Sequence, residues 1–398
     1  MTQANPQRDI VTDLIHHEYA APAGFLAPQP AVHKASTVIF PNVAAMRERE
    51  WKDKTSYTYG LHGTPTTYLL EERIATLEGA LQCLLVPSGL AAIATVALSL
   101  LKQGDEVLIP DNAYGPNKSL AEVELKQYGI THRYYDSQNP ADLAAKISPA
   151  TKLVWLEAPG SVTLEHQITC ALDNTWGAGL AFSPFDLLRD GGSLGADVSV
   201  HALTKYPSGG GDVLMGSITT RDLALHLRMK LTHMRIGFGV GVNDVEAVLR
   251  SLPSMSLRYF AHDKVARELA LWMGQQSPVV QVLHPALAGS PGHEAWQALC
   301  CTPANPQGAA AGLFSVIIDP KFSQDQVDRF CDSLKYFKLG YSWGGPMSLV
   351  VPYELPTMRS LPSSDVKPGT VVRFSVGLEA ASDLQVDLAQ ALKTAFGV

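Results

Sequence analysis

Cysteine is scarce in this chain of 398 residues, and the cysteines that occur are scattered. There are five: Cys83, Cys170, Cys300, Cys301 and Cys331, without a C-x-x-C pair or a histidine at ligand spacing. A disulfide framework needs an even, regularly spaced set of cysteines, and a structural zinc site needs paired ligands. The sequence therefore argues against both, and we expect no metal site.

Positive charge is also lacking. The chain has 31 lysines and arginines against 38 aspartates and glutamates, a formal net charge of −7. Binding to nucleic acid or to an anionic membrane depends on clustered positive charge, so we expect neither as a partner. Charged residues make up only 17% of the chain and hydrophobic residues 46%. That composition predicts a folded protein with a large core.

Uninterrupted hydrophobic runs are short. The longest candidate, 84–101, is broken by Pro87, Ser88 and Gly89, which leaves about a dozen helical residues, too few to cross a bilayer. The first ten residues, MTQANPQRDI, lack the apolar centre of a signal peptide. We therefore expect a soluble cytoplasmic protein.

The length of the chain favours two packed domains. Residues 1–55 are interrupted by prolines and are predicted to form a loop-like N-terminal arm, either disordered or packed on a partner subunit. Residues 56–250 are predicted to form a large domain. A long helix over 251–273 then leads into a smaller α+β domain, which extends to residue 398 and includes the Pro- and Gly-rich stretch 278–312.

Short apolar runs alternate with amphipathic stretches in the large domain. Strands are predicted at 106–110, 152–159, 169–176, 198–202 and 213–218, and helices from Thr66, at 116–129 and at 142–147. In the smaller domain we predict strands at 314–319 and 371–378 and a helix at 323–337. The alternation predicts an α/β fold with a mostly parallel sheet. Ligands bind such sheets at the carboxyl ends of the strands.

Lys205 stands at the end of one predicted strand, in the stretch DVSVHALTKYPSGGGDVLMGS (197–217). A buried strand precedes it and a cluster of glycines, 209–211, follows. Poor solvation in such a place disfavours the charged ammonium, lowers its pKa and leaves the amine free to act as a nucleophile. The ordinary alternative is a solvated lysine at a strand end, and the residue alone does not decide between them.

Three other strand ends carry matching features. Ser88 precedes a predicted helix whose N-terminus suits a phosphate, although a plain N-cap explains it equally well. Asp173 follows the apolar run TCAL and, if buried, needs a cationic partner. Tyr114 offers a flat aromatic face, although a core tyrosine is the commoner case. A phosphate cradle, an aromatic plate, a carboxylate for a protonated ring nitrogen and a lysine for an aldehyde together describe a pyridoxal phosphate site.

Eight segments give the chain a resemblance, over nearly its whole length, to a known family. They are SGLAA (88–92), DNAYGP (111–116), LEAPGS (156–161), ALDNTWGAG (171–179), DVSVHALTKY (197–206), GDVLMGS (211–217), YSWGGPMSL (341–349) and VVRFSVGLE (371–379). Together they resemble the Cys/Met-metabolism family of fold-type I pyridoxal-phosphate enzymes. The resemblance implies an aspartate-aminotransferase-like fold with a smaller C-terminal α+β domain.

The resemblance also assigns roles to residues. It implies that Lys205 binds the cofactor aldehyde and is catalytic together with Tyr114, which stacks on the ring, while Asp173 pairs the ring nitrogen. The phosphate would be held by Ser88, Gly89, Leu90 and Thr204. The substrate carboxylate would be bound by Arg373, helped by Ser342 and Trp343. A homotetramer built from dimers is implied, in which Tyr59 and the N-terminal arm reach the cofactor and substrate of a neighbouring subunit.

Four departures from the family pattern stand out. Relatives often have Tyr-x-Arg at the intersubunit contact, whereas Leu61 stands in the arginine position here, with His62 beside it as a substitute. Three glycines precede Asp212 where Gly-His-Ser-Asp is usual. Pro346-Met347 replace a bulky and an acidic residue. Finally, relatives carry a crossover helix where this chain has only VTLEHQIT (162–169).

The expected activity is β-elimination of cystathionine, a small amino-acid thioether, to homocysteine, pyruvate and ammonia. The tryptophan after Ser342 favours β- over γ-chemistry without deciding it. The alternatives are a γ-lyase or a homoserine-ester sulfhydrylase of the same family, or a catalytically impaired relative that acts as a binder.

The short connection before Asp173 leads to a structural expectation. If 152–159 and 169–176 are parallel strands, the nine residues 160–168 can return the chain but cannot also form a helix, since a parallel crossover usually takes a dozen or more residues. We therefore predict an extended link there and bare apolar surface on that face of the sheet. The long segment 183–196 is expected to cover part of it.

Overall fold

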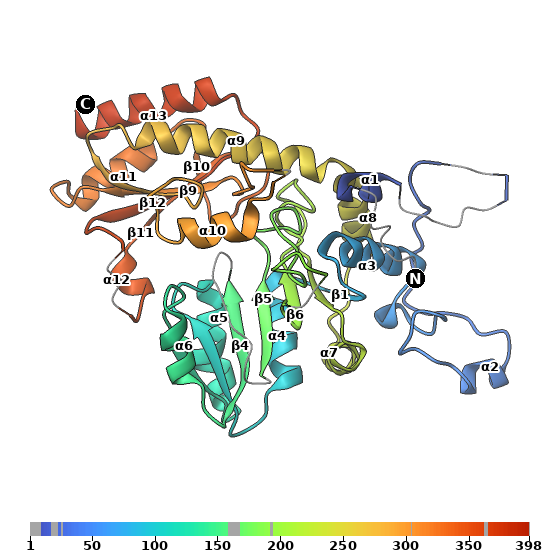
Figure 1. The fold of residues 1–398 in the computed structure, drawn as a ribbon. Helices are drawn as coiled ribbons and strands as arrows, with labels where there is room; N and C mark the ends of the chain where they lie inside the picture. Colours follow the sequence, from blue (N-terminus) through green and yellow to red (C-terminus); the bar gives the residue numbers. More distant parts are fainter. Residues whose placement is uncertain are drawn as a thin grey trace.

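The computed structural model describes residues 9–16, 23–24, 27–157, 168–191, 194–303, 305–361 and 365–397. Two β-sheets organise these residues, and the second sheet lies above the first in Figure 1. The predicted boundaries of the arm and the two domains stay predictions.

Seven strands form the larger sheet, in the order β1-β7-β6-β5-β4-β2-β3. Only β7 runs antiparallel to its neighbours, so the predicted mostly parallel sheet is confirmed. The strands are β1 (Gln82–Val86), β2 (Glu106–Pro110), β3 (Thr131–Tyr135), β4 (Thr151–Glu157), β5 (Thr169–Asp173), β6 (Val198–His201) and β7 (Gly216–Thr220).

Both faces of this sheet are buried, as the continuous apolar runs require. Along β4, Leu153 and Trp155 join the core cluster that includes side chains of α4 and α7. Val154 and Leu156 point the other way, into the cluster shared with α3 and α8. The helices of this part are α3 (Pro65–Glu78), α4 (Gly89–Leu100), α5 (Gly115–Ser119), the π-helical turn η2 (Leu120–Leu125), α6 (Pro140–Lys146), α7 (Leu223–Ile236) and α8 (Val242–Ser251), with short 3-10 turns η1 (Gly60–His62) and η3 (Leu252–Ser254).

Capping residues set where the first long helices begin. At the start of α3 the Thr64 hydroxyl accepts from the backbone N–H of Thr67, whose own hydroxyl accepts from the N–H of Thr64, and Pro65 takes the first helical position. The Ser88 hydroxyl accepts from the N–H of Ala91 at the start of α4. Both devices satisfy N–H groups that have no partner inside the helix. The helix predicted from Thr66 and the one that opens at Ser88 are therefore confirmed.

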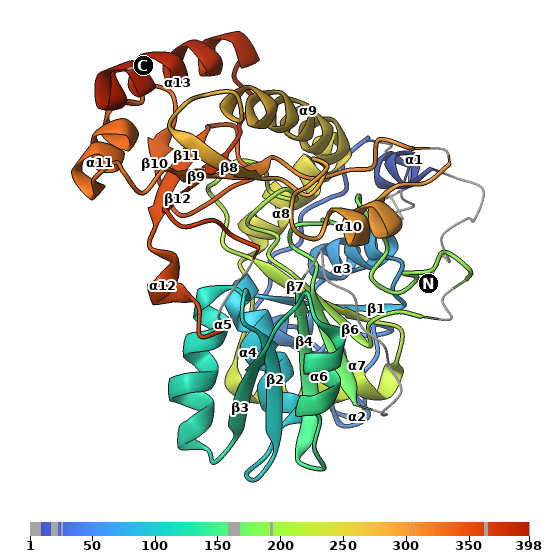
Figure 2. The same cartoon turned by 60° about the vertical axis from the view of Figure 1, so that its left-hand side comes forward.

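Five strands form the second sheet, in the order β10-β11-β12-β9-β8. Helices α9, α11 and α13 lie against it in Figures 1 and 2 and supply apolar side chains to its core cluster. The elements are α9 (Met255–Met273), β8 (Val279–Leu283), α10 (His293–Cys300), β9 (Leu313–Ile318), α11 (Gln324–Ser333), β10 (Lys338–Leu339), β11 (Leu349–Tyr353), α12 (Leu355–Met358), β12 (Thr370–Ser375) and α13 (Ala381–Phe396). The predicted linking helix and the strands near 314–319 and 371–378 are confirmed.

Some predicted elements differ from the structure. Strands β1 and β3 were not predicted, and β7 begins three residues later than the predicted strand at 213–218. The Pro- and Gly-rich stretch 278–312 contains both β8 and α10. The arm is not wholly loop-like either, because α1 (Ile10–Ile15) and α2 (Val43–Arg47) are helical and Leu14 is buried in the main core. Tertiary burial stabilises such short helices, which local propensity alone does not.

The prediction for the short crossover assumed two parallel strands. This assumption holds, since β4 and β5 are parallel neighbours, paired from Leu153–Thr169 to Glu157–Asp173. Most of the connecting segment, 158–167, lies outside the described residues, so its predicted extended path stays a prediction. The prediction of bare apolar surface on that face of the sheet is wrong, because the apolar side chains on both faces of β4 and β5 are buried. In the segment predicted to cover the sheet, Phe185 is buried. No helix within the described ranges is both long and apolar enough to span a bilayer.

Candidate active site

Lys205 lies just beyond the carboxyl end of β6, facing the second sheet. Its Nζ donates to the Ser342 hydroxyl at 2.9 Å and lies 5.4 Å from the centre of the Trp343 ring. Burial first, and then the positive charge of Arg373, lower the pKa of Lys205 to about 8, while the charge of Asp173 opposes both. The structure thus brings Lys205, Ser342 and Trp343 together, as the resemblance implies. The lowered pKa means that part of the Lys205 amine is neutral near neutral pH.

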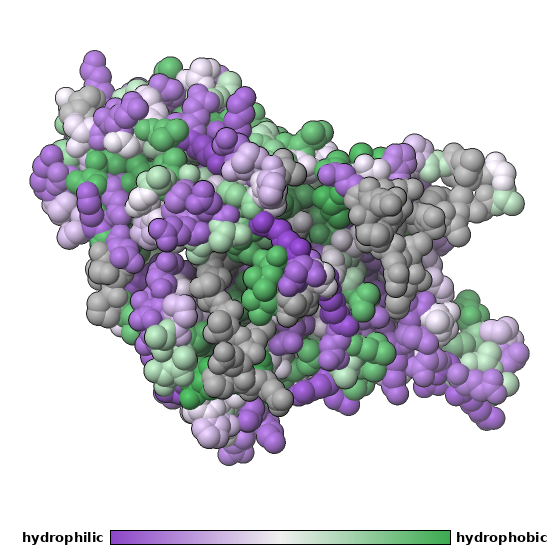
Figure 3. All heavy atoms as spheres, viewed as in Figure 1, coloured by the Kyte–Doolittle hydropathy of each residue, from purple (hydrophilic) through white to green (hydrophobic). Residues whose placement is uncertain are grey.

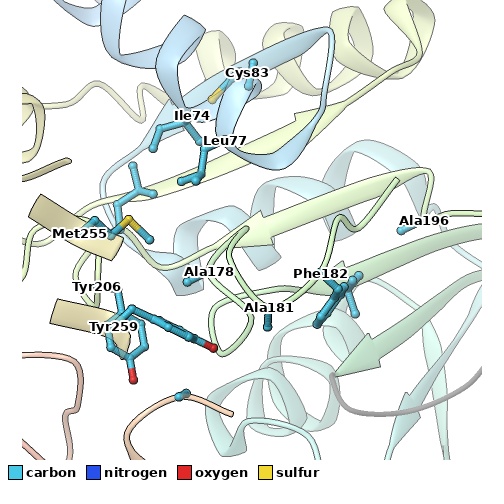
Figure 4. Close-up of a cluster of buried hydrophobic side chains, with 14 of the residues drawn as sticks. Ile74, Leu77, Cys83, Ala178, Ala181, Phe182, Ala196, Tyr206, Met255 and Tyr259 are labelled. Carbon is cyan, nitrogen blue, oxygen red and sulfur yellow. The ribbon is translucent and has the colours of Figure 1, made fainter. Parts of the chain in front are cut away.

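The backbone at Lys205 is fixed by the residue that follows it. Tyr206 is fully buried and packs against Tyr259 of α9, with ring centres 4.6 Å apart, in the core cluster of Figure 4. Its hydroxyl accepts from the N–H of Gly312 at 2.8 Å, and its carbonyl accepts from Arg258 at 2.7 Å. Gly209 makes room for that arginine, because a Cβ there would lie 2.1 Å from Arg258 Nη1. The glycine cluster therefore has a packing role.

Asp173 ends β5 and presents a carboxylate beside the lysine. Among the described residues, its Oδ1 accepts from the Thr175 N–H at 3.0 Å and from the Thr175 hydroxyl at 2.6 Å. The Thr175 hydroxyl oxygen in turn accepts from the N–H of Ala202, on the segment that leads to Lys205. Burial raises the pKa of Asp173 and the bonds from Thr175 oppose that rise. A cationic partner on the other oxygen would complete the charge balance of this carboxylate.

A second polar layer lies behind Asp173. Glu78 is fully buried and accepts from the Asn174 amide at 3.1 Å and from the Thr219 hydroxyl at 2.5 Å. His201, also fully buried, places Nδ1 3.4 Å from Glu78 Oε1. The charge of His201 lowers the pKa of Asp173, while Glu78 acts in the opposite direction. This layer fixes the carboxyl ends of β5 and β6 relative to one another.

The start of α4 is the predicted phosphate cradle. A Cβ on Gly89 would lie 2.7 Å from the Cβ of Ala202, and one on Gly216 would lie 2.4 Å from the Ser88 carbonyl oxygen. Thr204 binds the segment before Gly216, since its hydroxyl donates to the carbonyl of Met215 and accepts from the Met215 N–H. The helix N-terminus is thereby held close to the lysine segment, and its N–H groups are suited to an anion.

Tyr114 stands at the start of α5 with half of its surface (50%) exposed. Its backbone N–H donates to Glu157 Oε2 at 2.7 Å. Glu157 ends β4 directly opposite Asp173 in the sheet. Burial raises the pKa of Glu157, and the neighbouring Asp173 raises it further. The exposed ring is therefore anchored through its backbone, beside two carboxyl groups that do not ionise readily together.

Arg373 lies on β12, between Val351 and Ser315 of the flanking strands. Its Nε and Nη2 are buried and have no hydrogen-bond partner among the described residues. The guanidinium carbon lies 5.4 Å from the centre of the Tyr353 ring, and burial lowers the pKa of the group. A buried guanidinium without a partner is costly, and a carboxylate from a ligand would satisfy it with two parallel bonds.

Tyr59 does not share these contacts. It pairs with Thr37 through an isolated bridge and packs edge-on against His62, and 48% of its surface is exposed. His62 itself stacks on Trp51 and lies 2.9 Å from the Thr58 hydroxyl through Nδ1. The reach of Tyr59 into a neighbouring subunit stays a prediction, as does the substitution of His62 for the missing arginine.

The residues at this site fit pyridoxal phosphate. The start of α4 offers N–H groups to an anion, Asp173 has one oxygen without a bond from Thr175, and Lys205 has a lowered pKa. No group of three or more metal-ligating side chains occurs within the described part of the chain.

Sequence analysis does not identify three residues of the site: Glu157, Glu78 and His201. Glu157 lay within a predicted strand, and the signal that could have found it is a carboxylate directly after an apolar run, as at Asp173. His201 and Glu78 carried no such signal, because a histidine in a strand and a glutamate on an amphipathic helix are ordinary. Their proximity depends on the packing of α3 against the sheet.

Comparisons with known proteins agree with this geometry. A family model described as "Cys/Met metabolism PLP-dependent enzyme" matches residues 11–393. A Rhizobium johnstonii protein, provisionally named a cystathionine beta-lyase, is 37% identical over 394 residues, covering 94% of this chain and 93% of the relative. The cystathionine beta-lyase of Bordetella avium is 36% identical over 381 residues, covering 91% of each. The crystal structure of metB from Corynebacterium glutamicum matches with a TM-score of 0.83 at 26% identity, covering 97% of this chain and 98% of that one. The chain therefore belongs to the Cys/Met metabolism PLP-dependent enzyme family, whose cofactor is pyridoxal phosphate.

Proposed function

We propose that this protein is a carbon–sulfur lyase that splits cystathionine and water into homocysteine, pyruvate and ammonia by β-elimination. The observation that carries the proposal is the placement of a lysine with a lowered pKa beside Ser342, Trp343 and Arg373, whose buried Nε and Nη2 have no hydrogen-bond partner among the described residues. The names of the relatives described above support the choice of substrate.

Each residue has a defined task in this proposal. Pyridoxal phosphate, when bound, withdraws electrons from the α-carbon of the amino acid and so makes its proton acidic. Arg373 binds the α-carboxylate and orients that carbon toward Lys205. The neutral amine of Lys205 removes the α-proton, and Ser342 holds the amine in position. Asp173 keeps a negative charge beside the ring nitrogen.

The remaining contacts hold and shield the cofactor. The backbone N–H groups of Gly89 and Leu90 and the hydroxyls of Ser88 and Thr204 would hold the phosphate. Tyr114 would cover one face of the ring, which excludes water from the reacting atoms. These assignments rest on the positions of the residues around Lys205.

The identity of the keto acid product tests the proposal. Incubation of the holoenzyme with L-cystathionine is expected to release pyruvate and homocysteine. Release of 2-oxobutyrate and cysteine instead would indicate γ-elimination. Full cofactor absorbance with no product from L-cystathionine would indicate a binder.

We also propose a cytoplasmic homotetramer. The five cysteines are all free thiols, which suits a reducing compartment. Ile39, Val43 and Met46 of the arm are exposed, and Figure 3 includes apolar atoms on the projecting region around α2. Together with Tyr59, these side chains would be buried against another subunit. Light scattering after size-exclusion chromatography is expected to give four times the chain mass of 42.8 kDa.

A further inference from the structure

A cavity of about 450 Å³ extends from Arg373 into the space between the two sheets. Its walls come from the residues after β2, the turn after β3, the end of β8 and the segment that contains α12. Figures 1 and 2 show α12 reaching from the second sheet toward α5. This volume is in the range of small-ligand sites, roughly 300–1,000 Å³.

Two guanidinium groups line this cavity, those of Arg373 and Arg359. The proposed function uses only Arg373. Arg359 is exposed and makes no ion pair within 4 Å with the described residues. Partial burial of its guanidinium by neighbouring groups lowers its pKa, and Asp111, Glu157 and Asp136 oppose that lowering only through longer-range attraction. Both guanidinium groups can therefore donate hydrogen bonds to a carboxylate of a ligand.

The backbone around Arg359 is held firmly. The Asp111 carboxylate accepts from the N–H groups of Ser360 and Leu361 at 2.9 to 3.1 Å. Lys118 binds the same carboxylate at 2.9 Å and also donates to the carbonyl of Met358 at 3.0 Å. Because the Lys118–Asp111 pair is buried, this clamp fixes segment 358–361 against the large sheet. Asp111 is already neutralised by Lys118, which leaves Arg359 as a cation on a fixed support.

We propose that Arg359 is a specificity residue, which binds a second carboxylate at the distal end of the substrate side chain while Arg373 binds the α-carboxylate. The inference rests on the proposed function, because it places the substrate by its α-carboxylate. It identifies the substrate class as amino acids that carry a carboxylate beyond the sulfur. A charge-assisted hydrogen bond contributes about 1.5–3 kcal/mol, which corresponds to roughly 10- to 150-fold in affinity.

Two synthetic thioethers that differ in the distal carboxylate test its contribution to binding. S-(2-carboxyethyl)-L-cysteine carries the second carboxylate, and S-propyl-L-cysteine has a chain of the same length without it. Their dissociation constants are measured with the holoenzyme, from the change that each causes in the visible absorbance of the cofactor. The wild-type protein is expected to bind the carboxyethyl compound at least tenfold more tightly. In Arg359→Gln this preference should fall to near unity, and Arg359→Lys should restore part of it.

A matched control removes the same charge elsewhere. Arg329 is exposed on α11 and does not line the cavity, so Arg329→Gln should keep the wild-type preference. An unchanged preference in Arg359→Gln would overturn the proposal. Equal weakening of both compounds would also overturn it, since that result indicates a structural role. Pyruvate release from L-cystathionine is measured separately: if no pyruvate forms, the proposed function fails while the binding preference for the two compounds still tests Arg359.

Discussion

The amine of Lys205 is expected to titrate near pH 8 in the protein without cofactor, far below an ordinary lysine at about 10.4. At pH 8 about half of the molecules would then carry a neutral amine, compared with roughly 0.4% for an unperturbed lysine. The difference of about 100-fold in reactive amine is the kinetic advantage that the buried site gives to Lys205. Burial is its largest cause, and the charge of Arg373 is the second.

Cofactor loading measures this titration, because the neutral amine attacks the aldehyde. The rate at which apoprotein recovers the visible absorbance of bound cofactor is followed from pH 6.5 to 9.5. It is divided by the rate for Nα-acetyl-lysine, corrected for the neutral fraction of that amine, to remove ionisations of the cofactor itself. The corrected rate should rise about fivefold to tenfold between pH 7 and 9 and then level off, whereas an unperturbed lysine would give a rise of about 100-fold without a plateau.

Two variants test the causes. Arg373→Gln removes a positive charge near the amine, so the pKa of Lys205 should rise and the plateau should move to higher pH. Arg329→Gln, on α11, should leave the curve in place. A wild-type rate that still climbs tenfold per pH unit at pH 9 would refute the reasoning, as would a downward move in Arg373→Gln.

Four further changes have defined outcomes. Lys205→Ala should lower pyruvate release by at least about 10³-fold with an unchanged circular dichroism spectrum; wild-type turnover would show that another group is the base. Arg373→Lys should raise KM roughly 10- to 100-fold while cofactor absorbance persists, because a lysine loses the bidentate fork; unchanged kinetics would place the carboxylate elsewhere. Gly89→Ala should weaken cofactor binding about tenfold, since the new methyl would lie 2.7 Å from the Cβ of Ala202; an unaltered dissociation constant would contradict the tight cradle. Glu157→Gln should stabilise the apoprotein more at pH 8 than at pH 5, by on the order of 1 kcal/mol in urea unfolding. The folded state raises the pKa of Glu157. Above about pH 4.5 the unfolded chain therefore loses a proton that the folded chain keeps, and the wild-type protein loses stability as pH rises. The same difference in unfolding free energy between variant and wild type at both pH values would contradict this assignment.

Much of the site could be predicted because it depends on short-range sequence. The run before Lys205 alternates between apolar and polar residues, which predicts a strand, although both faces of β6 are buried, and the chain turns at the glycines that follow it. Ser88 and Asp173 also follow apolar runs at strand ends. In a parallel sheet these ends meet at one edge whatever the strand order is, so these three separate segments could be assigned to one place.

The elements that were missed depend on contacts between distant segments. Strand β8 lies in a stretch rich in proline and glycine, and its residues pair with β9, about thirty residues further along the chain. Helix α1 has six residues, too few to be stable alone, and it is held because Leu14 enters the core.

The sequence by itself determined the α/β class, the mostly parallel sheet and the lysine around which the site is built, because periodicity and strand-end chemistry are local properties. Only the tertiary structure decided what surrounds that lysine. The pairing of Glu157 with Asp173, the buried Glu78–His201 layer and the approach of Arg359 to the cavity join residues far apart in the chain. Charges interact through space, and the low polarity of the interior strengthens that interaction. The pKa of each group is therefore a property of the folded chain.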